Sequence, residues 1–307
     1  MISKSSKIYV AGHRGMVGSA TVRKLQKEGF NNLIFKTSKE LDLRNQNLVD
    51  RFIAEEKPEI IIDAAAIVGG IWANNEYPFK FLMDNMQIQN NLINAAVKNR
   101  VENFIFLGSS CIYPRDAQQP LKEEYLLTSS LESTNQWYAL AKISGVKLVE
   151  AARKVYGYNY VSLMPTNLYG PNDNFDLKNS HVLPALLRKF HEAKINNDIV
   201  TIWGTGTPKR EFLHVDDLAE AIHYFVLNPA DESLYNVGSN RELSIKELGN
   251  VIKNIVGFKG KINFDTSFPD GTPRKLLDSS KVMSLGWFPK ISLEKGIKLV
   301  YDNYPKS

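Results

Sequence analysis

The sequence predicts an α/β fold, with a doubly wound parallel sheet and a smaller C-terminal α/β lobe. Two observations support the sheet. Short apolar runs alternate with helix-patterned segments over the first 165 residues, and this alternation is typical of parallel strands covered by helices on both faces. A glycine-rich turn also joins the first apolar run to the first helical segment, as in the first strand-to-helix connection of doubly wound folds.

The predicted strands of the sheet are short apolar runs that end at glycine or polar residues. They span residues 7–12, 33–35, 60–66, 104–107 and 160–164, and helical spacing of apolar residues predicts helices over 16–28, 48–55 and 86–97. After residue 165 the pattern loosens, and prolines interrupt it. We therefore predict two domains, residues 1–165 and residues 166–307, and some segments of the second could return to the first.

The second domain carries weaker signals. Helices are predicted over 183–193 and 245–256, strands over 199–203 and 261–264, and a turn over 269–273. The sequence contains no internal repeat and no low-complexity segment. We expect this domain mainly to bind the substrate.

The composition is that of a soluble globular protein, with 43% hydrophobic and 23% charged residues among 307. No run approaches the roughly 20 apolar residues of a membrane span. The net charge of +5 comes from basic residues spread along the chain, so we expect neither a nucleic-acid partner nor a membrane. A single cysteine, Cys111, excludes an internal disulfide and fits a reducing compartment. We expect a cytoplasmic protein.

The glycine turn predicts a dinucleotide site in a Rossmann-like domain. Gly12, Gly15 and Gly18 form a G-x-x-G-x-x-G variant of the dinucleotide fingerprint, although such glycines can also serve only a tight turn. NAD sites usually carry an acidic residue after the second strand, whereas this chain has Lys36 to Lys39 there and Arg14 in the turn. Cations and hydroxyls favour a 2′-phosphate, so we expect NADPH over NADH. These lysines could also simply be solvated.

Tyr138 and Lys142 form the strongest catalytic candidate. Four residues apart on a predicted helix, they lie on one face, where the positive charge would favour the phenolate and make Tyr138 a proton donor and acceptor near neutral pH. Such a pair is common by chance on a helix surface. It gains weight because the glycine turn and a strand ending in Ser109, Ser110 and Cys111 precede it. Farther back, Asp42 and residues 63–66 could approach the adenine and the pyrophosphate.

The chain resembles the GDP-L-fucose synthases, a family of extended short-chain dehydrogenases/reductases, over almost its whole length. The resemblance rests on residues 11–18, 68–75, 107–114, 165–171, 179–182, 210–217 and 269–275. It implies an oxidoreductase that is also an isomerase. Epimerisation at carbons 3 and 5 of GDP-4-dehydro-6-deoxy-D-mannose would precede hydride transfer from NADPH to carbon 4.

The resemblance also implies catalytic roles. Cys111 and His181 would be the base and acid of the epimerisation, with the assignment between them open. A thiol of ordinary pKa near 8.5 needs little help to act as a base, although a lone cysteine can also be a small buried hydrophobe. His181 follows at a predicted helix start, whose dipole would depress its pKa. In the reduction, Tyr138 would protonate the carbon 4 oxygen, Lys142 would hold the nicotinamide ribose, and Ser109 would polarise the ketone.

The resemblance maps two further sets of residues. The implied cofactor site comprises Gly12, His13, Arg14, Gly15, Met16, Val17, Gly18, Lys36, Ser38, Leu41, Asp42, Ala65, Leu107, Gly108, Ser110, Lys142, Pro165, Thr166, Asn167, Leu168 and His181. The implied GDP site comprises Lys189, Trp203, Arg210 and Asp270. The chain departs from some relatives, which carry Arg in place of Lys189 or Ser38.

Three alternatives remain on the same scaffold. A sugar-nucleotide 4-epimerase would need neither Cys111 nor His181, and 4,6-dehydratases typically carry Asp-Glu where this chain has Ser110 and Cys111. A non-enzymatic NADPH-binding regulator is the third. No pair of histidines has metal-ligand spacing, so we expect no metal. The family resemblance also implies a homodimer, formed through the apolar faces of residues 86–97 and 139–152.

Overall fold

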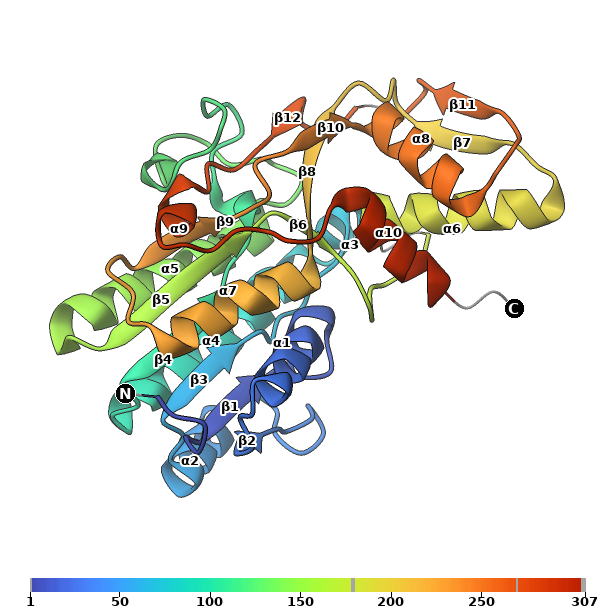
Figure 1. Cartoon of the computed structure of the whole chain (residues 1–307). Helices are drawn as coiled ribbons and strands as arrows, with labels where there is room; N and C mark the ends of the chain where they lie inside the picture. The colour runs from blue at the N-terminus through green and yellow to red at the C-terminus, as the bar shows by residue number, and fades with distance from the viewer. Residues whose placement is uncertain (1, 178–179, 269, 305–307) are drawn as a thin grey trace.

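A six-stranded, entirely parallel sheet forms the centre of the computed structural model, which describes residues 2–177, 180–268 and 270–304 (Figure 1). The strand order is β2-β1-β3-β4-β5-β9. The bounds are β1 Ile8–Ala11, β2 Leu33–Ile34, β3 Ile60–Asp63, β4 Asn103–Leu107, β5 Asn159–Pro165 and β9 Leu234–Val237. Both faces of this sheet are covered, and most residues of its strands are accordingly buried and apolar. The predicted doubly wound α/β fold is confirmed.

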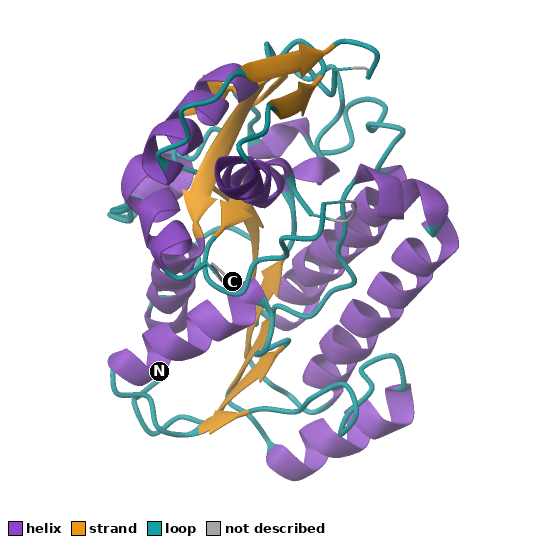
Figure 2. Ribbon diagram, turned by 90° about the vertical axis from the view of Figure 1, so that its right-hand side faces the viewer, coloured by secondary structure: helices purple, strands orange, loops and turns teal. Residues whose placement is uncertain are grey.

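Helices cover the sheet in two layers (Figure 2). On one face lie α2 Gln46–Glu56, α4 Pro78–Lys98 and α5 Gln136–Tyr156. On the other lie α1 Met16–Lys27, α7 Val215–Leu227 and α9 Ser280–Ser284. Short helices α3 Ile71–Glu76, η1 Ser110–Ile112 and η2 Glu123–Tyr125 occupy the connections. The two apolar cores therefore lie on opposite sides of one sheet.

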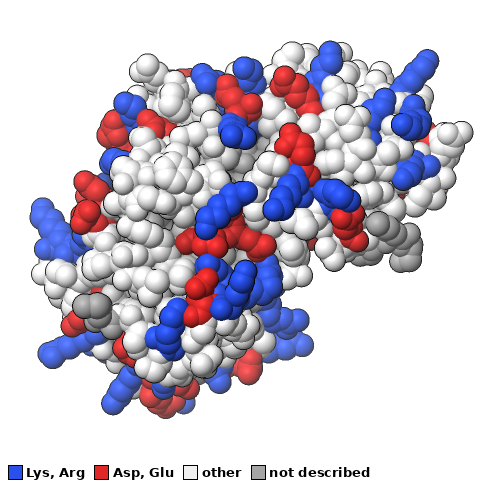
Figure 3. All heavy atoms as spheres, viewed as in Figure 1, with Lys and Arg blue, Asp and Glu red and all other residues white. Residues whose placement is uncertain are grey.

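Ion pairs join α1 to α7 on the face seen in Figure 3, where Lys and Arg side chains are interspersed with Asp and Glu side chains. Lys24 pairs with Glu220 at 2.8 Å, and Arg23 pairs with Asp216 at 2.8 Å. Partly exposed pairs of this kind contribute about 0–1 kcal/mol each. Apolar burial, rather than surface charge, therefore holds these helices on the sheet.

The smaller part of the molecule is built from two further sheets and three helices. One sheet contains β6 Asn167–Tyr169, β8 Lys209–His214, β10 Glu242–Ser244 and β12 Arg274–Lys275, and the other pairs β7 Val200–Trp203 with β11 Ile262–Asp265. The helices are α6 Val182–Asn196, α8 Ile245–Val256 and α10 Leu293–Asp302. A third apolar core, which includes Phe190, Leu248 and Ile297, lies between them.

The observed elements differ from the predicted ones in a few places. The helix predicted over 86–97 begins eight residues earlier, at Pro78, because proline fits the first turn of a helix, where no backbone donor is needed. The strand predicted over 60–66 ends at Asp63. Helix α8 has the predicted bounds. The predicted turn over 269–273 includes Pro269, which lies outside the described residues.

The chain returns to the large sheet after residue 166. Strand β9 pairs with β5 in parallel, and α7 packs against the sheet beside α1. Strand β9 was not predicted, whereas the sequence pattern places His223 on a helix, which α7 contains. Strands β5 and β9 are about 70 residues apart in the sequence. A local pattern of apolar residues cannot predict pairing over that separation.

A buried carboxylate connects the large sheet to the smaller part. Glu211 of β8 is fully buried, and its side chain accepts hydrogen bonds from the backbone N–H groups of Asn240 at 2.7 Å and Leu277 at 3.0 Å. A Cβ at position 238 would lie 2.4 Å from Oε1 of Glu211, so only glycine fits there. Burial raises the pKa of Glu211. The carboxylate thus holds together β8, the turn after β9 and the segment after β12.

Replacing Glu211 with alanine should destabilise the protein strongly. The Glu211→Ala change leaves two buried backbone donors without acceptors, which costs about 2–5 kcal/mol of unfolding free energy. Urea denaturation measures this loss. The control is Glu150→Ala, because Glu150 lies in an exposed pair with Lys147 and should change stability by no more than about 0.5 kcal/mol. Equal losses in the two variants would contradict this role of Glu211.

Candidate active site

The glycine turn brings the backbone close to the start of α1. Gly12 has φ of +74°, and a Cβ there would lie 2.6 Å from the carbonyl oxygen of Ala64. A Cβ on Gly18 would lie 2.1 Å from the carbonyl oxygen of Gly12. Gly15 is the N-cap of α1, so the free N–H groups and positive dipole end of this helix face the turn. This arrangement can bind a pyrophosphate.

Other predicted cofactor residues in and after the turn differ in exposure. The ring of His13 packs on Phe35 at 5.0 Å between centroids, and burial together with Arg14 lowers its pKa. Arg14 itself is exposed, whereas Met16 and Val17 are half-buried at the start of α1. Only Arg14 therefore presents a fully accessible charge at this turn.

The segment after β2 carries both signs of charge. Lys36 lies over the ring of Phe52, 6.0 Å from its centroid, and Ser38 is exposed. The carboxylate of Glu40 accepts hydrogen bonds from the backbone and hydroxyl of Thr37. The sequence analysis considered only the cations of this segment. The negative charge of Glu40 opposes the binding of a 2′-phosphate beside them.

Two further predicted residues of this region are already engaged. Asp42 is bound by the guanidinium of Arg44 at 2.8 and 2.9 Å, which lowers the pKa of Asp42. Leu41 is buried and Ala65 is half-buried. Asp42 can thus accept a ligand hydrogen bond only beside this ion pair.

Lys142 and Tyr138 lie on one face of α5, as predicted. The ammonium of Lys142 donates to the carbonyl oxygen of Leu107 at 2.7 Å and lies 5.8 Å from the ring centroid of Tyr138. It also lies 4.7 Å from the ring centroid of Phe106. Lys142 is 3% exposed, so α5 places a charged group in the floor of the site at the end of β4.

Lys142 was expected to favour the phenolate form of Tyr138, but the pKa of this half-buried phenol is raised. Burial raises the pKa of Tyr138 far above its ordinary value, and the negative charges of Cys111 and Asp63 raise it further. Burial also lowers the pKa of Lys142, although Asp63 and Cys111 oppose that fall. Tyr138 is therefore a neutral phenol, which can donate a proton to an oxygen that gains negative charge.

Asp63 is a further ionisable group of the site. It is fully buried at the end of β3, and its predicted approach to the adenine or pyrophosphate stays a prediction. One oxygen accepts from the backbone N–H of Ala65 at 3.1 Å, and the other has no hydrogen-bond partner among the described residues. Burial raises the pKa of Asp63 to about 6, and Lys142 opposes this rise. Asp63 acts electrostatically on both Lys142 and Tyr138.

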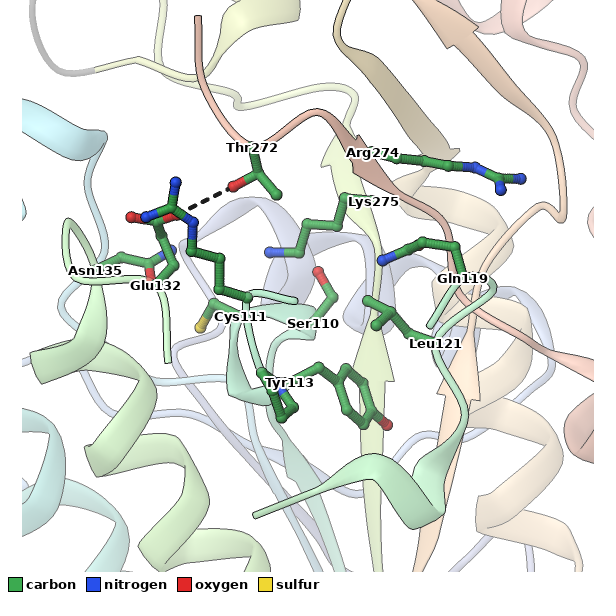
Figure 4. Close-up of a pocket in the computed structure, with 12 residues that line it drawn as sticks. Ser110, Cys111, Tyr113, Gln119, Leu121, Glu132, Asn135, Thr272, Arg274 and Lys275 are labelled. Carbon is green, nitrogen blue, oxygen red and sulfur yellow. Dashed lines mark hydrogen bonds and ion pairs between the residues drawn. The ribbon is translucent and has the colours of Figure 1, made fainter. Parts of the chain in front are cut away.

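The segment after β4 presents the serines and the cysteine. Ser109 is the N-cap of η1, and its hydroxyl accepts from the backbone N–H of Cys111 at 3.4 Å. Ser110 and Cys111 are buried, and both line a pocket that also contains Lys275 and Glu132 (Figure 4). Burial raises the pKa of Cys111, opposed first by the charge of Lys275 and by the Ser109 hydroxyl. Cys111 therefore needs more help to ionise than its ordinary pKa suggested.

His181 is the N-cap of α6, at the helix start predicted from the sequence. The residue as a whole is exposed, so only desolvation of its ring, together with the charge of Lys275, accounts for the lowered pKa. The motif that begins at Asn179 can be followed only from Ser180, since Asn179 lies outside the described residues.

Predicted cofactor residues at the end of β5 are fixed to β8. The Thr166 hydroxyl and the Asn167 amide donate to the carbonyl oxygen of Glu211 at 3.3 and 2.8 Å. A Cβ on Gly108 would lie 2.0 Å from the terminal carbon of Met164, so this glycine permits close packing. Leu107, Gly108, Pro165 and Thr166 are buried, and Asn167 and Leu168 are half-buried.

The four predicted GDP-binding residues lie on neighbouring elements of the smaller part. Lys189 of α6 lies 4.9 Å from the ring of Trp203, the exposed last residue of β7. The carboxylate of Asp270 accepts from the backbone N–H of Thr205, two residues after Trp203. Arg210 donates to the carbonyl oxygen of Thr272, two residues after Asp270. Two cations, an aromatic face and a carboxylate thus occur together, which suits a nucleoside diphosphate.

One aromatic neighbour of this set was missed. Phe268 stacks on Trp203 with centroids 4.5 Å apart and an angle of 12° between the rings. Both rings are exposed, so they form an apolar platform beside Lys189. A single phenylalanine before the predicted turn gave no sequence signal for this pairing.

Residues 2–177, 180–268 and 270–304 contain no group of three or more His, Cys, Asp or Glu side chains placed to hold a metal ion. Within the same ranges, no helix is both long and apolar enough to cross a membrane.

Comparison with known proteins identifies the relatives of this site. The family model described as "NAD dependent epimerase/dehydratase family" matches residues 8–238. The chain is 56% identical to GDP-L-fucose synthase 1 of Arabidopsis thaliana, over 100% of this chain and 95% of the relative.

Solved structures show the same relationship. A GDP-mannoheptose C4 reductase from Campylobacter jejuni with NADP bound is 43% identical, with a TM-score of 0.91 over 99% of both chains. A GDP-L-fucose synthetase from Naegleria fowleri bound to NADP is 29% identical, with a TM-score of 0.91 over 98% of this chain and 93% of the other.

The buried carboxyl of Asp63 should make stability depend on pH. Because its pKa is about 6 in the folded protein against an ordinary 3.8, its contribution is fully present below 3.8 and is lost as the pH rises through about 6. The Asp63→Asn variant should not lose this stability. As the pH rises from 3.8 to about 6, its unfolding free energy should therefore increase relative to that of the wild type by up to about 3 kcal/mol. Urea denaturation at a series of pH values measures this difference.

The matched control has the opposite sign. Arg44 lowers the pKa of Asp42, so Asp42 contributes stability that is present at neutral pH and lost on acidification. The Asp42→Asn variant should therefore lose stability relative to the wild type as the pH rises. A flat difference between wild type and Asp63→Asn would contradict the raised pKa of Asp63.

Proposed function

The chain belongs to the NAD dependent epimerase/dehydratase family, and we propose that it converts GDP-4-dehydro-6-deoxy-D-mannose to GDP-L-fucose. It is an NADP-dependent oxidoreductase with an epimerase activity. The observation that carries this assignment is 56% identity over the entire chain with a GDP-L-fucose synthase. The reaction comprises epimerisation at carbons 3 and 5 of the keto sugar and reduction of the carbon 4 ketone.

The residues at the carboxyl ends of β1, β4 and β5 fit NADPH, which supplies the hydride when bound. The glycine turn would hold the pyrophosphate, because Gly12 and Gly18 leave no side chain between the backbone and α1. Lys142 would hold the nicotinamide ribose, and Thr166 and Asn167 would lie beside the nicotinamide. Arg14, Lys36 and Ser38 are the candidates for the 2′-phosphate.

Cys111 and His181 are proposed as the acid–base pair of the epimerisation. The proton on a carbon next to a ketone is acidic, so one group must remove it and another must return a proton to the opposite face. The two side chains come from η1 and from the start of α6, and the charge of Lys275 acts on both. This common neighbour supports their lying across one site.

Tyr138 is proposed as the acid of the reduction. As hydride reaches carbon 4, its oxygen gains negative charge, and a neutral phenol can donate its proton there. The high pKa of Tyr138 keeps that proton in place beforehand. The Ser109 hydroxyl would polarise the ketone, and the nearby Lys142 ammonium would stabilise the phenolate left after transfer.

A second candidate is reduction of another GDP-keto sugar without epimerisation. It is favoured by the 43% identity, over 99% of both chains, with a GDP-mannoheptose C4 reductase. The two candidate reactions differ in whether the configuration of the sugar at carbons 3 and 5 changes. Exchange of solvent deuterium into carbons 3 and 5 is expected only of an epimerase.

Turnover with two active-site variants tests the proposal. Wild type should oxidise NADPH on addition of GDP-4-dehydro-6-deoxy-D-mannose and should form GDP-L-fucose. Tyr138→Phe should slow oxidation by about 10²–10⁴-fold, because the proton donor is lost. Cys111→Ser should give no GDP-L-fucose, and any reduced product should keep its original configuration. The measurements are NADPH absorbance and NMR of the product sugar.

Phe81→Leu is a suitable control, since Phe81 contacts the Tyr138 ring edge-on at 6.5 Å but offers no proton. It should remain within about tenfold of wild type. NADPH binding without oxidation by the wild type would exclude this substrate and favour the second candidate or a cofactor-binding regulator.

We also propose a cytoplasmic homodimer. A reducing location suits a reaction that needs the free thiol of Cys111. The outer surfaces of the two long helices α4 and α5 expose Phe79, Met83, Trp137, Leu140 and Leu148, with exposed fractions of 37–74%. An apolar surface shared by two parallel-packed helices supports pairing with a second copy.

Charges on this surface should separate the subunits. The double change Leu140→Glu and Leu148→Glu places carboxylates on the outer face of α5 and should convert a dimer to a monomer in sedimentation velocity. Ile195→Glu is the control, because Ile195 is exposed on α6, outside the two helices of the proposed interface, and should leave the dimer intact. A wild-type protein that sediments as a monomer would exclude the proposed dimer.

A further inference from the structure

The two-residue strand β12 holds Lys275 over the pocket that contains Cys111. Within β12, Lys275 lies opposite Arg210 of the parallel strand β8. The following backbone is fastened at both groups of Leu276, whose N–H donates to the side chain of Gln119 at 2.9 Å and whose carbonyl accepts from Leu121 at 2.7 Å. These contacts join β12 to the segment that follows Cys111, so the position of Lys275 is part of the fold.

The side chains of the two β12 residues point in different directions (Figure 4). Arg274 turns away from the pocket, and its guanidinium pairs with Glu242 at 2.7 Å. Lys275 points into the pocket, towards the side on which Ser110 and Cys111 lie. Its ammonium makes no hydrogen bond or ion pair with any residue that the structure describes. A half-buried cation without a fixed partner thus faces the only thiol of the chain.

The charged and polar groups around Cys111 come from three elements, β12, α5 and η1. Lys275 of β12 has the strongest charge effect on the Cys111 pKa, and Lys142 of α5 a weaker one in the same direction. Ser109 offers its hydroxyl from the start of η1, and Tyr138 of α5 is neutral.

Neighbouring groups shift the pKa of Lys275 in opposite directions. Burial and Arg210 lower its pKa, whereas Cys111 and Glu132 raise it. Because both groups are shielded from water, the ammonium form of Lys275 and the thiolate form of Cys111 stabilise each other.

We propose that Lys275 is a positioning residue whose ammonium supplies the positive charge that holds Cys111 as a thiolate. Cys111 then enters the reaction as the base and His181 as the acid, an assignment that rests on the proposed function. The thiolate takes a proton from the sugar carbon, an S–H bond forms, and the C–H electron pair enters the enolate. The enolate carbon then takes a proton from the His181 imidazolium on the opposite face, which regenerates the ketone.

The charge of Lys275 also assists the return of a proton by His181. Lys275 lowers the pKa of His181, so an imidazolium near it releases its proton more readily. One cation beside both groups therefore makes the thiolate more abundant and the imidazolium more acidic. The negative charge leaves the sulfur as the enolate forms.

Titration of the thiol tests this proposal without any substrate. Because Cys111 is the only cysteine, the ultraviolet absorbance of the thiolate, taken as the difference from Cys111→Ser at each pH, reports on this group alone. Lys275→Gln and Lys275→Met should raise the titration midpoint by about one pH unit, equal to a tenfold loss of thiolate. Lys275→Arg should restore most of the shift, because it restores the charge.

Arg274→Gln is the matched control, since it removes the same charge from the same strand but from a side chain that faces Glu242. Its thiol midpoint should equal that of wild type. Circular dichroism and NADPH affinity identify which variants are folded. Two neutral variants are used, so that the test still stands if one of them does not fold. An unchanged midpoint in a folded neutral variant would overturn the proposal, as would an equal shift in Arg274→Gln.

Turnover separates this proposal from the proposed function. With substrate, Lys275→Gln should slow deuterium exchange at carbons 3 and 5 by about tenfold near neutral pH, and raising the pH should recover part of that loss. A shifted thiol midpoint in a protein that does not turn over GDP-4-dehydro-6-deoxy-D-mannose would support the role of Lys275 and overturn the proposed function. Exchange slowed equally at every pH would contradict an effect through the thiol.

Discussion

The buried carboxylate of Glu211 is the constraint on which the geometry of the site depends. The side chain of Glu211 accepts hydrogen bonds from the backbone after β9 and after β12. Its backbone carbonyl oxygen accepts hydrogen bonds from the side chains of Thr166 and Asn167. One residue of β8 therefore sets the distance between the end of the large sheet and the strand that carries Lys275. A carboxylate at this depth is stable only because backbone donors surround it, so the surrounding segments cannot shift independently.

A second buried cluster sets the charges at the floor of the site. Asp63, Lys142 and Tyr138 lie at the ends of β3 and β4 and on the facing side of α5, and burial shifts the pKa of each towards its neutral form. The charges of Asp63 and Lys142 oppose those shifts in each other. Removing either one would leave the other buried without compensation, and such losses are costly. A neutral phenol above this pair is suited to donate a proton at the moment when an oxygen becomes negative.

Much of the fold and of the candidate site followed from local pattern. The alternation of apolar runs and helical segments predicted the parallel sheet, and the glycine turn and the Tyr138 to Lys142 spacing located two sides of the site. Other features could not be found this way. Strand β9 joins the sheet beside β5, and Phe268 meets Trp203, only because distant segments pack together. Lys275 belonged to a motif of the sequence analysis, but nothing local showed that it faces Cys111.

Which elements form and which chemical groups are available followed from the sequence, because helix and strand periods, glycine turns and side-chain types are local properties. The ionisation of those groups depends on tertiary packing. Lys142 was expected to favour the phenolate form of Tyr138, yet desolvation raises the pKa of this phenol, and desolvation also raises the pKa of the buried carboxyl of Asp63. Desolvation depends on every atom that surrounds a group, and those atoms come from segments that are remote in the sequence.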